Sequence, residues 1–325
     1  MINPFANFDA KRRAIALQAA VVVVLLALIA AAIHNAAVNL EKQNIASGFG
    51  FLNRTAGFDI SQHLIPYKNT DTYARAFWVG LTNTLLVATL GIIFATIFGF
   101  LLGIARLSSN WLVAKLALVY VEVVRNVPLL LWLFVIYFGV LLRLPSVADS
   151  LHIPGGILLN LRGLYVPWPW GTPAWPVIGA HNVEGGLAIE PELIALTMGL
   201  VSYTTAFIGE IVRGGIESVS RGQGQAARAL GLNESQALRH VILPQALRAI
   251  VPPLTNQYVN LAKNSSLAVA VGYPDLVSVF AGTILNHTNQ AVETIAITMA
   301  VYLVISLSIS AAMSALDARV ALEER

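Results

Sequence analysis

Long apolar runs separated by polar segments dominate the pattern along this chain of 325 residues. Each run reaches or approaches the roughly 20 residues that an α-helix needs to cross the hydrocarbon core of a bilayer. The runs cover approximately residues 14–33, 77–105, 111–142, 193–212, 246–271 and 292–316. This pattern predicts an all-α integral membrane protein with about six transmembrane helices.

The first run is interpreted as a retained transmembrane span. Lys11, Arg12 and Arg13 precede it, and residues 30–32, all alanine, resemble a signal-peptide cleavage site. The apolar region of a signal peptide, however, has roughly 7 to 15 residues, and this run is longer. We therefore expect a first span that is kept, with its basic flank in the cytoplasm.

The third run is longer than a bilayer core is thick, and it contains Glu122, Arg125 and Pro128. At about 1.5 Å per residue, one straight helix of this length would project beyond the hydrocarbon core. We expect the first turns of this run to lie obliquely or at the membrane interface.

A stripe of small residues marks the second run. Ala95, Gly99 and Gly103 recur every four residues, so they share one face of a helix. Membrane helices pack closely along such faces. The stripe therefore predicts a close contact with another helix.

Composition supports insertion in lipid and argues against other classes of protein. Hydrophobic residues make up 57% of the chain and charged residues 11%, against roughly 25% charged residues in soluble domains. The net charge of +3 does not indicate a nucleic-acid partner, because the basic residues flank apolar runs and orient helices there. There is no cysteine, and the six histidines show no metal-ligand spacing, so we expect neither disulfides nor a metal site.

Basic residues divide unequally between the two sides of the membrane. Six spans place both termini on one side, whose segments carry Lys11, Arg12, Arg13, Arg106, Arg213, Arg221, Arg228, Arg239, Arg248, Arg319 and Arg325. The opposite side carries Lys42, Arg54, Lys68, Arg75, Arg143 and Arg162. The positive-inside rule therefore predicts that both termini are cytoplasmic.

The chain is accordingly expected to divide into four parts. These are a cytoplasmic N-terminus with the first span at 1–34, a periplasmic segment at 35–76, a core of five spans at 77–316 and a cytoplasmic tail at 317–325. Within the core, 143–192 forms a periplasmic insert rich in proline and tryptophan, which is typical of an interfacial or docking loop. The other long loop, 213–245, is cytoplasmic.

The cytoplasmic loop has strong helix signals. An alanine-rich helix is expected from about Gln223 to Leu230, and Gly231 would end it. Asn233 can then cap a second short helix, with Gln236 at the reciprocal position of a capping box. Two short helices joined at a glycine would present small side chains to a partner.

The same loop carries a specific resemblance. Gln225-Ala226-Ala227, then Gly231, then Val241-Ile242-Leu243-Pro244 resembles the EAA loop of ABC importer permeases. Residues 120–130, 206–216 and 263–267 are similar to stretches of polar amino acid permeases, the histidine/glutamine permease family. With its extra first span, the chain looks most like the general L-amino-acid and glutamate/glutamine importer permeases. The resemblance implies a type I ABC importer permease core behind that span.

The resemblance also implies a site and partners. The loop would form a coupling helix docked in a groove of an ABC ATPase dimer, and ATP and Mg would bind that dimer rather than this chain. The coupling residues implied are Gln223, Gln225, Ala226, Ala227, Gly231, Leu243 and Pro244. A second permease subunit would complete the channel in a bacterial inner membrane, and a periplasmic binding protein would deliver the amino acid.

One residue departs from the family pattern. The family usually has glutamate where this chain has Gln225. An amide can donate and accept hydrogen bonds but cannot form a full ion pair with a basic residue of the ATPase. This departure favours a heterodimeric channel, whose other half keeps the acid, over a homodimer.

Three polar groups interrupt the spans. Glu122 and Arg125 are three residues apart on one helical face, so they either neutralise each other or line the substrate pathway. The pair Glu210 and Arg213, at the end of a span, is more consistent with a scaffold. The third group forms a candidate gate or pathway element, because burying it in lipid would be costly; it consists of Lys263, Asn264, Ser265 and Ser266.

Two other classes of function fit the sequence less well. A secondary transporter driven by an ion gradient would show inverted repeats, and none is evident. An intramembrane enzyme would need a catalytic motif such as G-x-S-x-G or HExxH, and neither occurs. No G-x-x-x-x-G-K-[ST] motif occurs either, as expected for a permease that relies on a separate ATPase.

Overall fold

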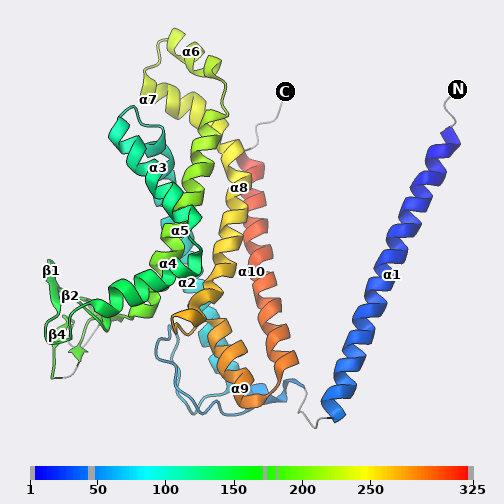
Figure 1. The fold of residues 1–325 in the computed structure, drawn as a ribbon, viewed down its shortest axis with the longest axis vertical. Coiled ribbons are helices and arrows are strands. Elements are labelled where there is room, and N and C mark those ends of the chain that lie inside the picture. Colours follow the sequence, from blue (N-terminus) through cyan, green and yellow to red (C-terminus); the bar gives the residue numbers. More distant parts are fainter. Residues whose placement is uncertain (1–3, 43–47, 171–173, 181, 321–325) are drawn as a thin grey trace.

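The computed structural model describes residues 4–42, 48–170, 174–180 and 182–320 as a mostly helical protein (Figure 1). Its α-helices are α1 (Pro4–Lys42), α2 (Tyr73–Arg106), α3 (Trp111–Asn126), α4 (Leu129–Phe134), α5 (Pro191–Glu217), α6 (Arg221–Ala229), α7 (Glu234–Ala237), α8 (Leu243–Asn264), α9 (Leu285–Thr288) and α10 (Ala291–Val320). Short π-helical segments lie at Val135–Val140, Leu238–Ile242 and Val277–Ile284. Short 3-10 segments lie at Phe49–Asn53, Leu141–Arg143 and Ser265–Ala270.

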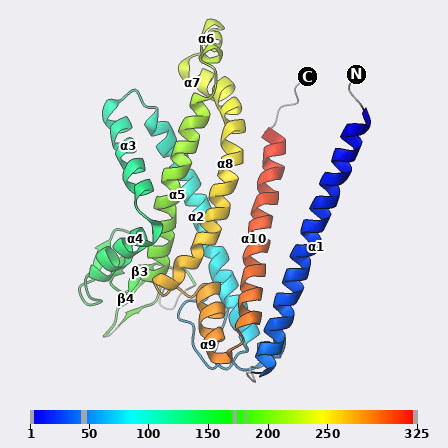
Figure 2. The ribbon, with the colours of Figure 1, turned by 45° about the vertical axis from the view of Figure 1, so that its right-hand side comes forward.

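The apolar runs correspond to long helices. Within the described part of the chain, α1, α2, α5 and α10 are long and apolar enough to cross a membrane, and α3 with the segment after it makes a fifth, bent candidate. The remaining predicted run lies in α8, which is more polar than the others. Because α8 packs between α5 and α10, its polar residues do not all have to face lipid (Figure 2).

The third run is bent, and the direction of the bend corrects our expectation. The axes of α3 and Leu129–Arg143 differ by 107°. We expected the first turns to lie obliquely, but α3 runs alongside α5 and it is α4 that turns aside (Figure 1). Pro128 explains the break, because a proline disfavours the helical conformation of the residue before it, and Val127 is extended at φ −104° and ψ 128°.

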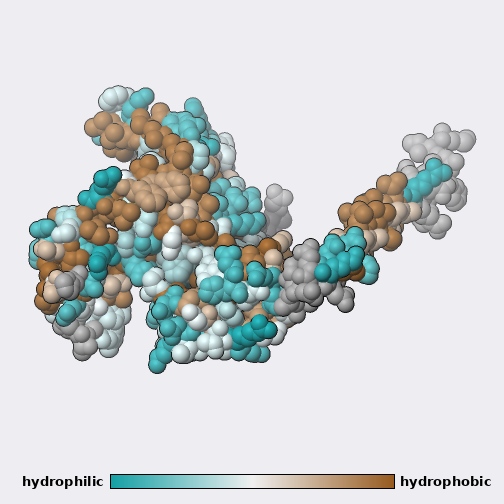
Figure 3. Space-filling model, turned by 60° about the horizontal axis from the view of Figure 1, so that its bottom comes forward, coloured by the Kyte–Doolittle hydropathy of each residue, from teal (hydrophilic) through white to brown (hydrophobic). Residues whose placement is uncertain are grey.

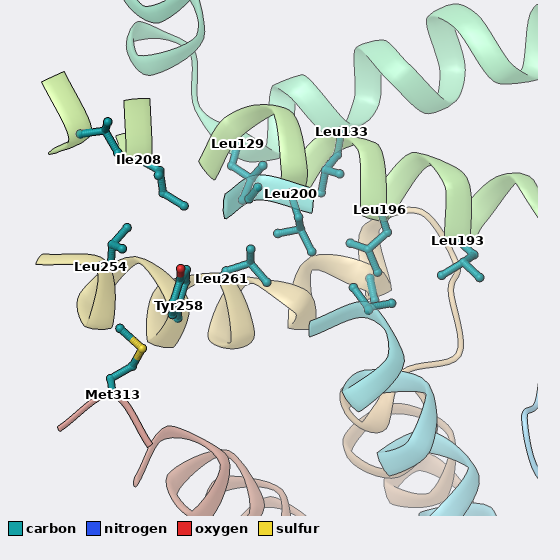
Figure 4. Packing of buried hydrophobic residues seen from close by; sticks show 14 of the residues in the cluster. Leu129, Leu133, Leu193, Leu196, Leu200, Ile208, Leu254, Tyr258, Leu261 and Met313 are labelled. Atoms are coloured by element: carbon teal, nitrogen blue, oxygen red, sulfur yellow. The ribbon is translucent and has the colours of Figure 1, made fainter. Parts of the chain in front are cut away.

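The core lies between α2, α4, α5 and α8. Leu129 and Leu133 of α4 face Leu196 and Leu200 of α5, and α8 contributes Leu254, Tyr258 and Leu261 on the other side (Figure 4). Leu133, Leu196 and Leu200 are fully buried. The core therefore fixes α5 as the central helix of the bundle.

The small-residue stripe of α2 lies in the contact with α5, as predicted. Ala95, Gly99 and Gly103 are all buried. A Cβ atom added at Gly103 would lie 2.6 Å from Val212 Cβ and 2.8 Å from the backbone oxygen of Gly209. The two backbones thus approach too closely for any side chain at this position.

The insert 143–192 was expected to be a loop, but it contains short strands. These are β1 (Leu151–Ile153), β2 (Ile157–Asn160), β3 (Gly163–Val166), β4 (Val177–Ile178), β5 (Val183–Glu184) and β6 (Leu187–Ile189). Four of them form an antiparallel sheet in the order β1-β2-β3-β6, and β4 pairs with β5. Leu158, Asn160 and Tyr165 alternate with more exposed neighbours, so one face of the sheet is buried.

The ends of the helices define two sides of the bundle. The loop of α6 and α7 lies at the same end as the start of α1 and the end of α10, while the strands lie toward the opposite end (Figure 1). This arrangement agrees with an even number of crossings between α1 and α10. The predicted tail 317–325 begins inside α10, and residues 321–325 lie outside the described residues.

Gly103→Ala is expected to push α2 and α5 apart. The clash involves a backbone oxygen that cannot rotate away, so we expect the free energy of unfolding to fall by about 1–3 kcal/mol, as for other overpacked cores. The melting temperature in detergent measures this effect. Gly214→Ala on α5 is the control, because nothing lies within 4 Å of a Cβ there. Equal melting temperatures for both variants would contradict the close contact.

Candidate functional site

The loop between α5 and α8 has the predicted two-helix form. α6 ends at Ala229 with Leu230 as its C-cap, and Gly231 follows in the left-handed region at φ +86°, with no atom within 4 Å of a Cβ placed there. Asn233 Oδ1 accepts a hydrogen bond from the Gln236 amide at 2.9 Å, and the Asn233 amide donates to Gln236 Oε1 at 3.0 Å. The predicted glycine turn and capping box are therefore confirmed.

The loop presents one face outward, and this face differs from our expectation in one residue. Gln223, Gln225 and Ala226 are exposed. Ala227 was expected to face a partner, but it is 3% exposed and packs against its own chain, so it cannot dock directly. Helix periodicity explains this, because Gly224 and Ala227 are three residues apart, share the inner face of the short helix and are both buried.

Leu230 is a candidate contact residue that the sequence reasoning missed. Its side chain is 84% exposed at the tip of the loop, immediately before the Gly231 turn. This exposed leucine is next to the exposed residues of the predicted docking face, so it is available for contact with a partner. The signal was present in the sequence, since Leu230 is the only large apolar residue between residues 220 and 231.

The outward face continues into the start of α8. Pro244 is exposed there, and Leu243 is partly buried. A groove of about 870 Å³ lies beneath α6 and opens between the loop and the end of α2, with Leu107, Ile216, Gln225, Arg228 and Ile242 in its lining. The loop is therefore raised above the bundle and not packed flat on it.

Ion pairs anchor the base of this loop. Arg213 donates to Glu210 at 2.5 Å and to Glu217 at 2.5 Å, and Arg106 of α2 lies 3.4 Å from Glu210. The predicted Glu210–Arg213 scaffold pair is therefore confirmed. Arg106 was considered only for topology, yet it joins α2 to the last turns of α5.

Glu122 and Arg125 do not neutralise each other. No ion pair joins them within the described residues, and both side chains are exposed. The Arg125 guanidinium instead lies over the ring of Phe207 at 5.1 Å, a cation–π geometry. The pairing interpretation is therefore wrong, and the lining of a substrate pathway stays a prediction.

The group at residues 263–266 is divided by a change of helix type. α8 ends at Asn264 and the chain continues as a 3-10 helix. Ser265 is fully buried and donates to the Ala262 carbonyl at 2.8 Å, so it faces away from any pathway. Lys263 is exposed, and Asn264 and Ser266 are partly buried, so these three side chains remain candidates for a pathway.

Comparisons with known proteins give a consistent picture. Residues 91–322 match the family described as binding-protein-dependent transport system inner membrane component. The general L-amino acid transport system permease protein AapQ of Rhizobium johnstonii is 45% identical, over 98% of this chain and 95% of that protein. The glutamate/glutamine/aspartate/asparagine transport system permease protein BztB of Rhodobacter capsulatus is 36% identical, over 98% of this chain and 96% of that protein.

A solved structure shows the same fold. The crystal structure of an amino acid ABC transporter with histidines has a TM-score of 0.57 and 28% sequence identity to this chain. The match covers 76% of this chain and 95% of that one. The similarity in structure therefore extends well beyond the EAA-like loop.

The ion pair between Arg106 and Glu210 is expected to stabilise the bundle. A double-mutant cycle of Arg106→Gln and Glu210→Gln should give a coupling energy on the order of 1 kcal/mol in thermal unfolding, because both side chains are partly buried. The exposed pair Arg228–Glu234, at 3.8 Å, is the matched control and should give a smaller coupling. Equal couplings would show that Arg106 does not anchor the loop.

Proposed function

The chain belongs to the family of binding-protein-dependent transport system inner membrane components, and we propose that it forms one half of the channel of an ATP-driven importer for L-amino acids. The observation that carries this proposal is the raised two-helix loop with its outward face. Relatives that match nearly the whole chain are named as amino acid permeases, which supports amino acids as the substrate class. The same relatives favour an ATP-driven importer over a transporter driven by an ion gradient.

The loop is proposed to couple this chain to an ABC ATPase dimer. The docking surface consists of the outward residues Gln223, Gln225, Ala226, Leu230, Gly231 and Pro244, with Leu243 at its edge. Nothing lies within 4 Å of a Cβ placed at Gly231, so an ATPase groove can approach the backbone from that side. ATP and Mg would bind the ATPase subunits, and their closure would move the loop. This chain would supply no catalytic residue.

Movement of the loop would reach the membrane helices through its anchors. α5 enters the loop and α8 leaves it, and both belong to the central core. Arg106 and Arg213 hold the base of the loop through Glu210, so a force on α6 is transmitted to α2 and α5 together. A rigid connection of this kind is what alternating access requires of a coupling element.

A second permease subunit is proposed to complete the channel. Gln225 cannot form the full ion pair that the family glutamate makes, which favours a different partner subunit over a second copy of this chain. A periplasmic binding protein would deliver the amino acid at the end of the bundle that carries the strands. The loop end, which is rich in basic residues, would lie in the cytoplasm with both termini.

The substrate pathway is proposed to pass the exposed charges of α3 and α8. Glu122 offers a carboxylate for an ammonium group, and Arg125 and Lys263 offer cations for a carboxylate. Asn264 and Ser266 can add hydrogen bonds. Ser265 is left out of the pathway, because its hydroxyl is buried and bonded within its own helix.

Gly231→Leu is expected to abolish substrate-stimulated ATP hydrolysis in the complex reconstituted with its ATPase and binding protein. Leucine is strained at φ +86° by about 1–2 kcal/mol, and its side chain would fill the docking surface. Gly155→Leu is a matched control, because Gly155 has φ +93° and equally open surroundings but lies among the strands of the insert. Stimulation that survives Gly231→Leu, or that both variants lose alike, would contradict the coupling role.

Glu122→Gln and Arg125→Gln are expected to slow amino acid uptake into proteoliposomes while the complex still assembles. The reason is that each side chain is exposed and, in the part of the chain that the structure describes, neither takes part in an ion pair that its loss would break. Lys115→Gln, also an exposed charge on α3, should leave uptake unchanged. Loss of assembly without a change in uptake per assembled complex would show that the two residues are structural.

A further inference from the structure

A polar cavity lies between the insert and the rest of the bundle. It has a volume of about 570 Å³ and is placed at the end that carries the strands, between the turn from β2 to β3 and the start of α5. Figure 3 tilts this end toward the reader, and a notch is visible between the insert and the bundle. The volume is within the range of roughly 300–1,000 Å³ that is typical of small-molecule sites. The described residues that line it include none of the proposed coupling or pathway residues.

Side chains of opposite charge line this cavity without pairing with each other. Arg162 comes from the turn between β2 and β3, and Glu190 and Glu192 come from the start of α5. No ion pair joins Arg162 to either glutamate in the part of the chain that the structure describes. Opposite charges that stay apart across a cavity can each bind the matching group of a zwitterion.

Buried polar groups hold the turn that carries the positive charge. Asn160 is fully buried, its side-chain oxygen accepts a hydrogen bond from the Arg162 amide at 2.8 Å, and its side-chain nitrogen donates to Ser150 Oγ at 2.9 Å. The Arg162 guanidinium donates a hydrogen bond to Asn182 Oδ1, which directs the side chain. A guanidinium has five N–H donors, so this bond leaves donors for a carboxylate.

The two glutamates are positioned by neighbours from other parts of the chain. Ser61 Oγ donates to Glu190 Oε2 at 3.2 Å, and Tyr137 Oη donates to Glu192 Oε1 at 2.6 Å. Each bond involves one carboxylate oxygen, so the other oxygen of each glutamate can accept a further hydrogen bond. Burial raises the pKa of Glu190, and the charge of Glu192 raises it further. A cation bound beside both carboxylates would relieve this repulsion.

We propose that this cavity binds a free L-amino acid before the amino acid enters the membrane pathway. Arg162 binds the α-carboxylate, and Glu190 together with Glu192 binds the α-ammonium. The side chain of the amino acid lies against apolar residues of the lining, which are Leu142, Leu161 and Val183. Such a wall does not select one side chain, so the site accepts amino acids of several kinds. This inference rests on the proposed function, which supplies the substrate class.

The cavity adjoins the segment that leads to the candidate pathway residues of α8. Gly272 lines the cavity, two residues after the end of the 3-10 helix Ser265–Ala270. That helix begins directly after Lys263 and Asn264, the last residues of α8. Its six residues cover about 12 Å, at about 2.0 Å per residue. The cavity and the candidate pathway residues are therefore connected through one short helix.

Protection of a single cysteine in the cavity tests the binding directly, since the chain has no cysteine of its own. Ala188→Cys lies in the exposed lining of the cavity, and a maleimide labels it in the complex purified in mild detergent. We expect L-glutamine to slow this labelling several-fold. L-Glutaminamide lacks the carboxylate and N-acetyl-L-glutamine lacks the ammonium, so each should need about tenfold higher concentrations for the same protection. Labelling of Val177→Cys, exposed on β4 and outside the cavity, should not change.

Charge variants test the two ends of the site. Arg162→Gln and Glu190→Gln should each raise the L-glutamine concentration needed for protection of Ala188→Cys by about tenfold, because each removes a hydrogen bond to a charged group. Arg162→Gln should also make L-glutaminamide as effective as L-glutamine. Arg143→Gln and Glu184→Gln remove exposed charges outside the cavity and should leave the protection unchanged.

Three results would overturn the proposal: no protection by L-glutamine, equal protection by both analogues, or loss of protection in the control variants. Ca²⁺ that protects without L-glutamine, and that needs Glu190 but not Arg162, would assign the cavity to a cation and overturn it as well. The labelling requires neither ATP nor transport, whereas uptake by the reconstituted wild-type complex tests the proposed function. Protection without ATP-driven uptake would therefore contradict the importer alone, and uptake without protection would contradict the cavity site alone.

Discussion

Helices in a bilayer gain little by burying apolar side chains against one another, so their packing depends on how closely their backbones approach. In this protein the decisive approach is between α2 and α5, where Gly103 meets Val212 and the backbone of Gly209. α4 and α8 then pack around α5 with leucine and tyrosine side chains. The chain continues from the end of α5 into the raised loop. The position of the loop therefore depends on the contact between the backbones of α2 and α5.

Ion pairs extend that contact to the site. Glu210 follows directly after Gly209 of the glycine contact, and it pairs with both Arg106 of α2 and Arg213 of α5. The loop above is consequently attached to two helices and not to one. The two helices of the loop, α6 and α7, are short. The loop can nevertheless transmit a movement, because its base is held by the well-packed contact between α2 and α5.

The spans and the loop could be predicted because their signals are local. Apolar length predicts a span, and Gly231 and Asn233 determine a turn and a cap through their own conformational preferences. Helix periodicity puts Gly224 and Ala227 on one face, but which face of α6 turns inward depends on neighbours that are distant in sequence. The same holds for the side to which the chain turns after Pro128 and for the position of Arg125 over Phe207 in place of a pair with Glu122. The strands of the insert escaped prediction because each has only two to four residues, too few for alternation to be recognised.

The central claim is that this chain is a channel half driven by a separate ATPase. The most direct measurement is to purify it in mild detergent from its native membrane, identify the copurifying chains by mass spectrometry, and assay the reconstituted complex for amino acid uptake. The account predicts copurification of an ATPase and a second permease, with uptake that needs ATP and the binding protein. A chain that purifies alone and moves amino acids along an ion gradient without ATP would contradict it.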